Sequence, residues 1–238
     1  MSEEKIRELE EKIKKLEGEI ERLKAVHEIQ NLMSKYEYYH TAQRDDKIAE
    51  MFAERAEDIS AEIAFWGRYK GSQGTRKLYA KVHPYLYEKA GLGSLFIHTL
   101  TTPVIEVAKD GQTAKGVWIS PGIETSRVNG KLQATWCWIK YGVDFVKENG
   151  KWKFWRLKVY RIFRCPYEKS WVEMPEVDPG PFELPEELKP DEPSVYDRPY
   201  SPWTKPDLVP EPPEPYDTWD GKSMVLPSIK APGPYPQT

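Results

Sequence analysis

Three side chains that can transfer protons stand out in the sequence. Tyr36 and His40 are four residues apart in a stretch with helical periodicity, which places them one turn apart on the same helix face. His98 lies in a predicted strand between apolar residues. Histidine, with an ordinary pKa of ~6.5, accepts or donates a proton at neutral pH. Tyrosine, with an ordinary pKa of ~10, is a poor base but can donate to a leaving oxygen. These residue types favour an acid–base elimination.

The hypothesis gives each of these groups a role. His98 takes a proton from a substrate carbon or hydroxyl, while Tyr36, with His40, protonates or orients the departing oxygen. Two polar aromatics on an inward helix face either hydrogen-bond within a core or face a cavity, and the pair favours a cavity. Positioned acid–base groups contribute about 10²–10⁴-fold in rate. Four further residues are candidates for lining that cavity, although each could instead pack in the core: Tyr39, Trp118, Tyr141 and Arg161.

The sequence lacks the motifs of bound metals and cofactors. It has four histidines, none in an H-x-H or H-x₃-H pair. Of the two histidines without a catalytic role, we expect His27 to be structural and His83, just before Pro84, to lie at the surface. There is no G-x-G-x-x-G, P-loop or G-x-S-x-G motif, and Gly71–Gly74 indicates only a turn. We therefore predict no metal and no cofactor.

Composition limits the classes of partner. The chain has 238 residues, a net charge of −3 and a pI of about 5.9, so no basic surface indicates nucleic acid. The N-terminus is charged rather than apolar, and no apolar run reaches the ~18 residues of a membrane span. Two cysteines, Cys137 and Cys165, make no disulfide or metal framework. We expect a reduced, cytoplasmic protein without nucleic-acid or membrane partners.

Two helices are predicted at the start of the chain. Residues 3–27 carry apolar residues at spacings of three and four, with Ile at heptad position a and Leu at d, which favours a parallel two-stranded coiled coil. The alternative is an amphipathic helix lying on its own domain or on a neighbour. In both cases we expect a homo-oligomer, a trimer or a dimer. The second helix, 28–41, has a continuous stripe that ends in Tyr36 and His40.

The rest of the domain is predicted as short helices followed by a meander of strands. Asp45 and Asp46 cap a short helix that reaches Phe52. In order, the further elements are a strand at 59–69, a helix at 75–88, a strand at 94–108 and a strand at 113–120 that Pro121-Gly122 interrupts. Helices gathered on one side of an antiparallel sheet make an α+β fold.

A long hairpin closes the domain. Its first arm, 131–147, alternates with the period of two that is typical of a strand with two different faces. Asn149-Gly150 supplies the two positive-φ residues of a tight turn, and the return arm, 152–163, is as aromatic as the first. Asn129-Gly130 predicts another tight turn. One face of this hairpin needs helices over it, and we expect the other to line a subunit contact or a pocket rim.

From Pro166 the composition changes abruptly. Eighteen of the 21 prolines lie in 166–238, so this segment is neither helical nor sheet-forming. It also carries aromatic residues, which simple disorder would lack. We expect an ordered, extended arm that its rings pin to this subunit or the next. The alternative is a flexible proline-rich linker or ligand.

Several of these segments resemble one known family. The runs 29–36, 98–105 and 148–152, with the intervening Asp45 and Phe52, resemble the SnoaL-like branch of the nuclear transport factor 2-like superfamily over about residues 28–163. The resemblance implies a cone-shaped α+β barrel, in which a curved antiparallel sheet wraps around helices and a deep apolar pocket opens at one end. The chain then divides into an association helix (1–27), the SnoaL-like domain (28–165) and the proline-rich wrapping arm (166–238).

The resemblance also suggests a function. Bile acid 7α-dehydratase and scytalone dehydratase are similar in layout, and there a pocket tyrosine and a strand histidine carry the elimination, which Tyr36 and His98 match. Thr41 and Pro121-Gly122 stand near positions where the bile-acid enzyme has aspartates. A formaldehyde-releasing diarylpropane lyase shares the fold. The resemblance therefore implies a cofactor-independent lyase or dehydratase that acts on a hydroxylated aromatic or polycyclic small molecule. The alternatives are a non-catalytic binding or assembly module, or an isomerase or cyclase.

Overall fold

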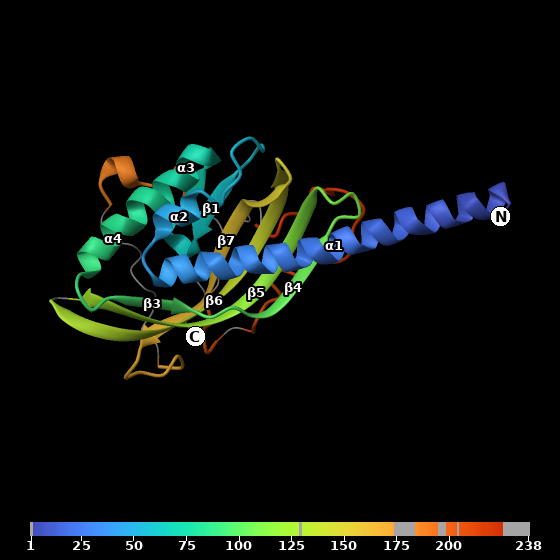
Figure 1. Ribbon diagram of the computed structural model, residues 1–238. Helices are drawn as coiled ribbons and strands as arrows, with labels where there is room; N and C mark the ends of the chain where they lie inside the picture. Colours follow the sequence, from blue (N-terminus) through green and yellow to red (C-terminus); the bar gives the residue numbers. More distant parts are fainter. Residues whose placement is uncertain (1, 129, 174–183, 195–198, 204, 226–238) are drawn as a thin grey trace.

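The computed structural model describes residues 2–128, 130–173, 184–194, 199–203 and 205–225 (Figure 1). It begins with one long helix, α1 (Glu3–Thr41), where the sequence predicts two. No proline separates the two predicted halves, so the helix continues through residue 28. The side chain of Ser2 caps it by accepting a hydrogen bond from Lys5 N at 3.3 Å. The first half of α1 projects beyond the domain, and the second half lies across the sheet (Figure 1).

A strongly curved, mixed sheet forms the body of the domain. The strand order is β2-β1-β7-β6-β5-β3, and β4 also pairs with β5. All pairs are antiparallel except β1 with β7. The strands are β1 (Ser60–Ile63), β2 (Arg68–Lys70), β3 (Leu95–His98), β4 (Thr101–Val107), β5 (Thr113–Val128), β6 (Lys131–Glu148) and β7 (Lys151–Pro166). The predicted α+β class is confirmed.

The long hairpin of β6 and β7 matches its prediction closely. Asn149 and Gly150 have φ of 51° and 73°, so they form the tight turn between the strands. The inward face of β6 lies in the hydrophobic core, through Cys137, Ile139, Tyr141, Val143 and Phe145. Of the second predicted turn, Asn129 lies outside the described residues.

Three strand predictions differ in detail. The segment 59–69 is a hairpin rather than one strand, because Gly67, with φ of 107°, turns the chain between β1 and β2. The segment 94–108 is divided into β3 and β4 at Thr99-Leu100, and Thr102, which has φ of 48°, lies within β4 where its pairing with β5 shifts register. β5 continues through Pro121-Gly122. The Pro121 carbonyl accepts from Thr99 N, between β3 and β4, so the missing proline N–H faces this gap rather than a paired strand.

Short helices cover the inward face of the sheet next to α1. They are α2 (Asp45–Ala49), α3 (Gly71–Lys77) and α4 (His83–Ala90), with a π-helical segment, η2 (Leu78–Val82), that joins α3 to α4. The predicted turn at Gly71–Gly74 is therefore already helical. Pro84 cannot donate to the α-helical ladder, and the π-helical turn precedes it. Val82 and His83 are consequently both buried, so the prediction of a surface His83 is wrong.

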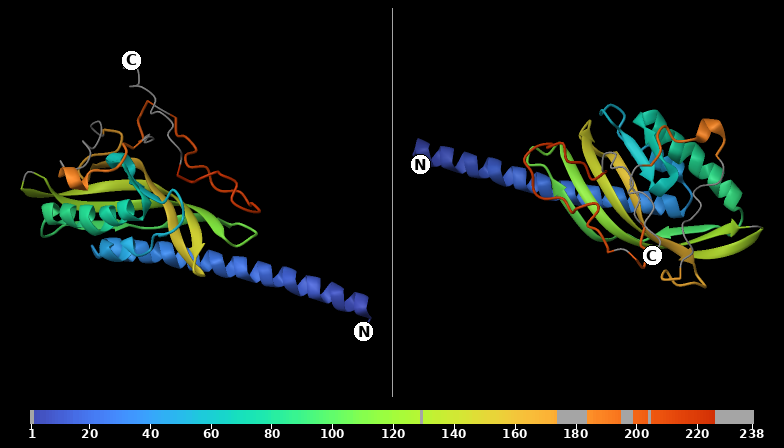
Figure 2. Two further views of the ribbon diagram at one scale, coloured as in Figure 1. Left: turned by 90° about the horizontal axis from the view of Figure 1, so that it is seen from above. Right: turned by 180° about the vertical axis from the view of Figure 1, so that it is seen from behind.

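The described part of the C-terminal arm runs along the outer face of the sheet, opposite α1 (Figure 2). Its one regular turn is the 3₁₀ helix η3 (Glu186–Leu188). Tyr216 is buried, and Trp219 packs on Trp155 with ring centroids 4.7 Å apart. The arm thus covers the face that the sequence assigns to a subunit contact or pocket rim. Phe182, Tyr196 and Tyr235 of the arm lie outside the described residues.

Candidate active site

A cavity of about 470 Å³ lies between the inward face of the sheet and the helices. Tyr36 and His40 of α1 and the sequence-distant His98 of β3 all line it. Of the four further candidates, Tyr141 and Arg161 also line it. Tyr39 and Trp118 do not: each packs in the core, Trp118 against Phe145. Apolar side chains form much of the remaining wall, including Ile63, Trp66, Leu86, Phe96, Ile139 and Val159.

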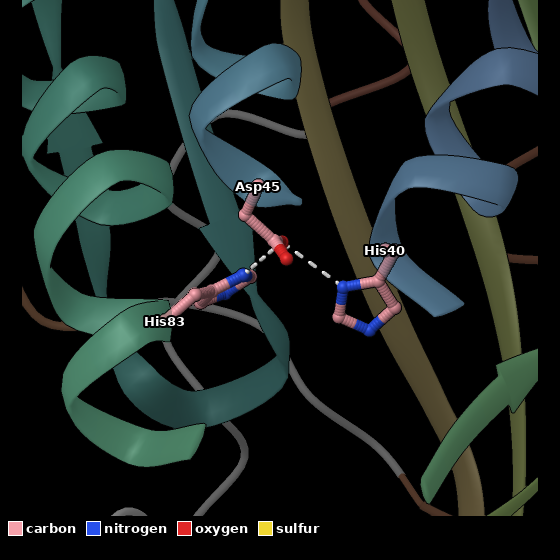
Figure 3. Close-up of side chains that lie close together, drawn as sticks. All are labelled: His40, Asp45 and His83. Carbon is pink, nitrogen blue, oxygen red and sulfur yellow. Dashed lines mark hydrogen bonds and ion pairs between the residues drawn. The ribbon is translucent and has the colours of Figure 1, made fainter. Parts of the chain in front are cut away.

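On the side of the cavity that the helices form, the carboxylate of Asp45 contacts two histidines, His40 and His83 (Figure 3). Asp45 Oδ1 lies 2.6 Å from His83 Nδ1 and 3.0 Å from His40 Nδ1. Its other oxygen, Oδ2, accepts a hydrogen bond from the Tyr87 hydroxyl at 2.7 Å. Asp45 is fully buried, and it stands in the first turn of α2, so its carboxylate holds this cluster rather than capping the helix as predicted.

The cluster polarises its members. Burial by itself would raise the pKa of Asp45, but the neighbouring His83 and His40 hold the pKa of that carboxyl well below its usual range. Burial by itself would lower the pKa of His40, yet the hydrogen bond and charge of Asp45 raise it above its ordinary value. An ionised carboxylate accepts hydrogen bonds only, so each histidine donates through Nδ1 and keeps Nε2 for another partner.

On the sheet wall, His98 faces a second carboxylate. His98 Nε2 lies 3.5 Å from Glu124 Oε1, and Arg164 Nε donates to Glu124 Oε2 at 2.7 Å. Burial would raise the pKa of Glu124, but the hydrogen bond from His98 and the charge of Arg164 hold it well below its usual range. The other nitrogen of His98, Nδ1, is buried without a hydrogen-bond partner next to Gly122, which has no Cβ.

The helical side and the sheet side of the cavity are in contact through the imidazole rings of His40 and His98. The centroids of His40 and His98 are 5.7 Å apart and the rings are stacked. Tyr36 lies beside them, with its hydroxyl 3.3 Å from that of Tyr79. Burial raises the pKa of Tyr36 well above its usual range, so this phenol stays neutral and keeps an O–H that can donate a hydrogen bond.

A third acidic group lies behind the cavity. The Tyr141 hydroxyl donates to Glu37 Oε1 at 2.5 Å, while Glu37 Oε2 is buried without a partner. Burial raises the pKa of Glu37, although the nearby histidines act in the opposite direction. Burial likewise raises the pKa of Tyr141 well above its usual range.

Two sets of side chains have the donor types that metal ions require. One is His40, Asp45 and His83, and the other is His98, Glu124 and Cys137; within each set the donor atoms lie within 4.8 Å of one another. Two histidines and one carboxylate could hold a divalent cation. In the first set, however, direct hydrogen bonds from His40, His83 and Tyr87 already satisfy the carboxylate.

The sequence hypothesis omitted four residues of this site. Asp45 was assigned to a helix cap and His83 to the surface, while Tyr87 and Glu124 received no role. The spacing of His83 and Tyr87, four residues apart on one helix, is a signal that could have placed both on the same face. The approach of Glu124 to His98 depends on the pairing of β3 with β5, in which His98 lies opposite Gly122, and no local pattern shows this register.

Comparison with known proteins agrees with this architecture. The sequence model of the SnoaL-like domain matches residues 21–158. No curated protein matches the sequence. The crystal structure of LinA superposes with a TM-score of 0.53 at 18% identity, covering 66% of this chain and 99% of LinA. Hexachlorocyclohexane dehydrochlorinase LinA-type3 from Novosphingobium barchaimii LL02 gives a TM-score of 0.50 at 20% identity, covering 66% of this chain and 99% of that one.

A third structure comes from Novosphingobium aromaticivorans DSM 12444 and carries the provisional name scytalone dehydratase. Its TM-score is 0.48 at 18% identity, covering 63% of this chain and 93% of that one. At such identities the likeness shows the fold alone.

No helix among the described residues has the length and apolar character needed to cross a membrane.

Proposed function

Because the chain belongs to the SnoaL-like domain family, we propose that it uses its cavity as a cofactor-independent lyase. The reaction is the elimination of water or formaldehyde from a hydroxylated aromatic or polycyclic small molecule. One observation carries the proposal: two histidines that each have a carboxylate partner, His83 with Asp45 and His98 with Glu124, line the same largely apolar cavity. Paired groups of this kind supply a base and an acid without a bound cofactor.

We assign the base to His83. Its Nδ1 donates to Asp45, so Nε2 carries the lone pair. The sequence hypothesis gives this role to His98, but its Nδ1 is buried beside Gly122, and its Nε2 faces the carboxylate of Glu124, so Nε2 carries a proton and is a donor rather than a base. We therefore propose that His98 acts with His40 on the leaving group.

In the dehydration, His83 Nε2 takes the proton from the carbon next to the hydroxyl-bearing carbon. That electron pair forms the new C=C bond as the C–O bond breaks. His40, whose pKa is raised, or His98 returns a proton to the departing hydroxide, which leaves as water. Tyr36 donates a hydrogen bond to the same oxygen. Asp45 and Glu124 hold the two imidazoles in position and stabilise their charged forms.

In the release of formaldehyde, the same base removes the proton of a hydroxymethyl O–H. The C=O bond of formaldehyde forms as the C–C bond breaks, and the electron pair stays on the adjacent carbon, which the acid protonates. The walls support this substrate class, since Trp66, Phe96 and Tyr141 place aromatic rings around a space large enough for a small polycyclic molecule.

The first experiment is a screen of phenolic and steroid alcohols for loss of water or formaldehyde by the full-length protein. For any substrate that turns over, we expect His83→Gln and His98→Gln each to lower kcat by about 10²-fold or more. His27→Gln is the matched control, because His27 is an exposed histidine of α1 outside the cavity. A wild-type rate in both cavity variants would end this proposal and leave a ligand-binding module.

We also propose that the chain forms a homo-oligomer.

A further inference from the structure

The first half of α1 carries an apolar stripe that no described part of this chain covers. Its six members are between 39% and 72% exposed: Ile6, Leu9, Ile13, Leu16, Ile20 and Leu23. This half of the helix projects beyond the sheet in every view (Figures 1 and 2). In proteins most helical stability comes from packing an apolar face against a partner. The stripe therefore needs a partner.

The stripe points away from the chain's own domain. Successive residues of a helix are rotated by about 100°, so the stripe and the core-facing residues of α1 lie on opposite sides of one helix. The core-facing residues are Ala25, Ile29, Met33 and Tyr36. On the side of the stripe, the rest of α1 is exposed, at His27, Asn31, Ser34 and Tyr38. No described segment of the domain would therefore obstruct a second helix that lies along the stripe.

The charges beside the stripe select the partner. With Ile at a and Leu at d, each g residue of a parallel two-stranded coil meets the e residue five positions later on the other chain. The three such pairs are all of opposite charge: Lys5 with Glu10, Lys12 with Glu17, and Glu19 with Lys24. An antiparallel pair sets e against e and g against g. In the antiparallel register that sets Leu9 opposite Ile20, Glu10 would meet Glu17, so the e side would bring two like charges together.

We propose that residues 5–24 of α1 form a parallel, in-register, two-stranded coiled coil with a second copy of this chain. Ile at a with Leu at d favours two strands over three. The two domains then lie on the outer sides of the coil, because the core-facing side of each α1 points away from the shared axis. This inference does not depend on the proposed chemistry, and it specifies the geometry of the assembly proposed above.

Charge reversal tests the pairing. In a dimer of Lys12→Glu, position 12 of each chain places a glutamate against Glu17 of the other chain. In a dimer of Glu17→Lys, position 17 of each chain places a lysine against Lys12 of the other chain. We expect each variant alone to weaken dimerisation of the full chain by roughly tenfold in sedimentation. An equimolar mixture of the two should restore it, because both mixed pairs are again of opposite charge. Lys14→Glu, at an outward position, is the matched control. Unchanged dimerisation in both single variants would overturn the pairing.

Cross-linking tests the register without depending on any contact between the domains. In Leu16→Cys, a parallel in-register coil brings the two new thiols together, and mild oxidation should give a covalent dimer. Gly18→Cys, which faces away from the partner, should not cross-link; the native Cys137 and Cys165 are buried. A monomer or trimer by mass would overturn the proposal. So would a Leu9→Cys chain that cross-links only to an Ile20→Cys chain, because that result would show an antiparallel pair.

Discussion

Asp45 is the residue on which the histidine cluster depends. It is fully buried, it accepts hydrogen bonds from three side chains, and they come from α1 and α4. An unpaired carboxylate at such a position would be costly, so the two imidazoles and the Tyr87 hydroxyl are held where Asp45 needs donors. The same bonds fix the tautomer and orientation of His83. A single side chain thereby positions two imidazoles.

Replacing Asp45 with Asn keeps its size and removes its charge. Burial alone lowers the pKa of His40, and the charge of Asp45 is what raises it. We therefore expect the pKa of His40, followed by NMR titration, to fall in Asp45→Asn. The basic limb of the pH–rate profile should move to lower pH, because the protonated form of His40 is needed. Asp46→Asn, an exposed neighbour, is the control. An unchanged His40 pKa would contradict the assigned coupling.

Gly122 provides the space for His98. A Cβ at this position would press on His98 Nδ1 and would lie 2.7 Å from Ile97 O and 2.9 Å from Cys137 O. Because two of these atoms are backbone, the strands themselves would have to shift. We expect Gly122→Ala to cost about 1–3 kcal/mol in the free energy of unfolding, measured with urea, and to lower kcat as His98 moves. Gly18→Ala, on the projecting helix, should do neither. Full activity in Gly122→Ala would remove His98 from the account.

At the scale of the elements, local patterns were reliable where one force dominates. The alternation of β6 and the Asn149-Gly150 turn predicted the hairpin, because one face is buried and the turn needs two positive-φ residues. The apolar periodicity of residues 28–41 likewise placed Tyr36 and His40 on the inward face of α1. The position of His83 could not be predicted in this way, because it depends on the π-helical turn before Pro84 and on the hydrogen bond of His83 to Asp45 of α2. The approach of Glu124 to His98 required the strand register.

The C-terminal arm supplies partners to buried charged residues on the outer face of the sheet. Asp144 is fully buried on the outer face, and it accepts hydrogen bonds from Met224 N at 2.9 Å and from Ser223 Oγ. Lys115, also buried, pairs with Asp220 at 2.5 Å. If the arm left, Lys115 would lose this ion pair and Asp144 would keep only Arg156, so the arm and the domain should unfold together.

Close backbone approach of the arm makes Gly142 a sensitive position. A Cβ there would press on the carbonyl of Met224 and would lie 3.0 Å from the ring of Tyr160. We expect Gly142→Ala to displace the arm and to speed proteolytic cleavage within 205–225. Lys222→Ala, an exposed change in the arm itself, should leave the cleavage rate unchanged. Equal protection in both variants would show that the arm does not rely on this contact.

At the scale of the whole molecule, stability should depend on pH through the site carboxylates. The pKa values of Asp45 and Glu124 are held below their usual range in the folded state. The unfolded chain therefore binds their protons first as the pH falls, so their contribution is present above about pH 4 and is lost below it. Glu37 and Asp144, whose pKa values burial raises, act in the opposite direction.

The contribution of the Asp45 charge to stability can be measured by comparing wild type with Asp45→Asn. The gap in unfolding free energy between wild type and Asp45→Asn should be largest near neutral pH and should shrink as the pH falls below 4. Denaturant titrations at several pH values measure it directly. A gap that stays constant across that range would mean that the charge of Asp45 contributes nothing to folding.

The central claim is that substrate reacts between the His83 and His98 walls of one cavity. The most direct measurement is a crystal structure of His83→Gln with a substrate from the alcohol screen. The account predicts that the carbon which loses its proton lies within about 3.5 Å of residue 83, with the leaving oxygen in hydrogen-bond reach of His40 or His98. A substrate bound outside this cavity, or one whose leaving oxygen faces away from both histidines, would contradict it.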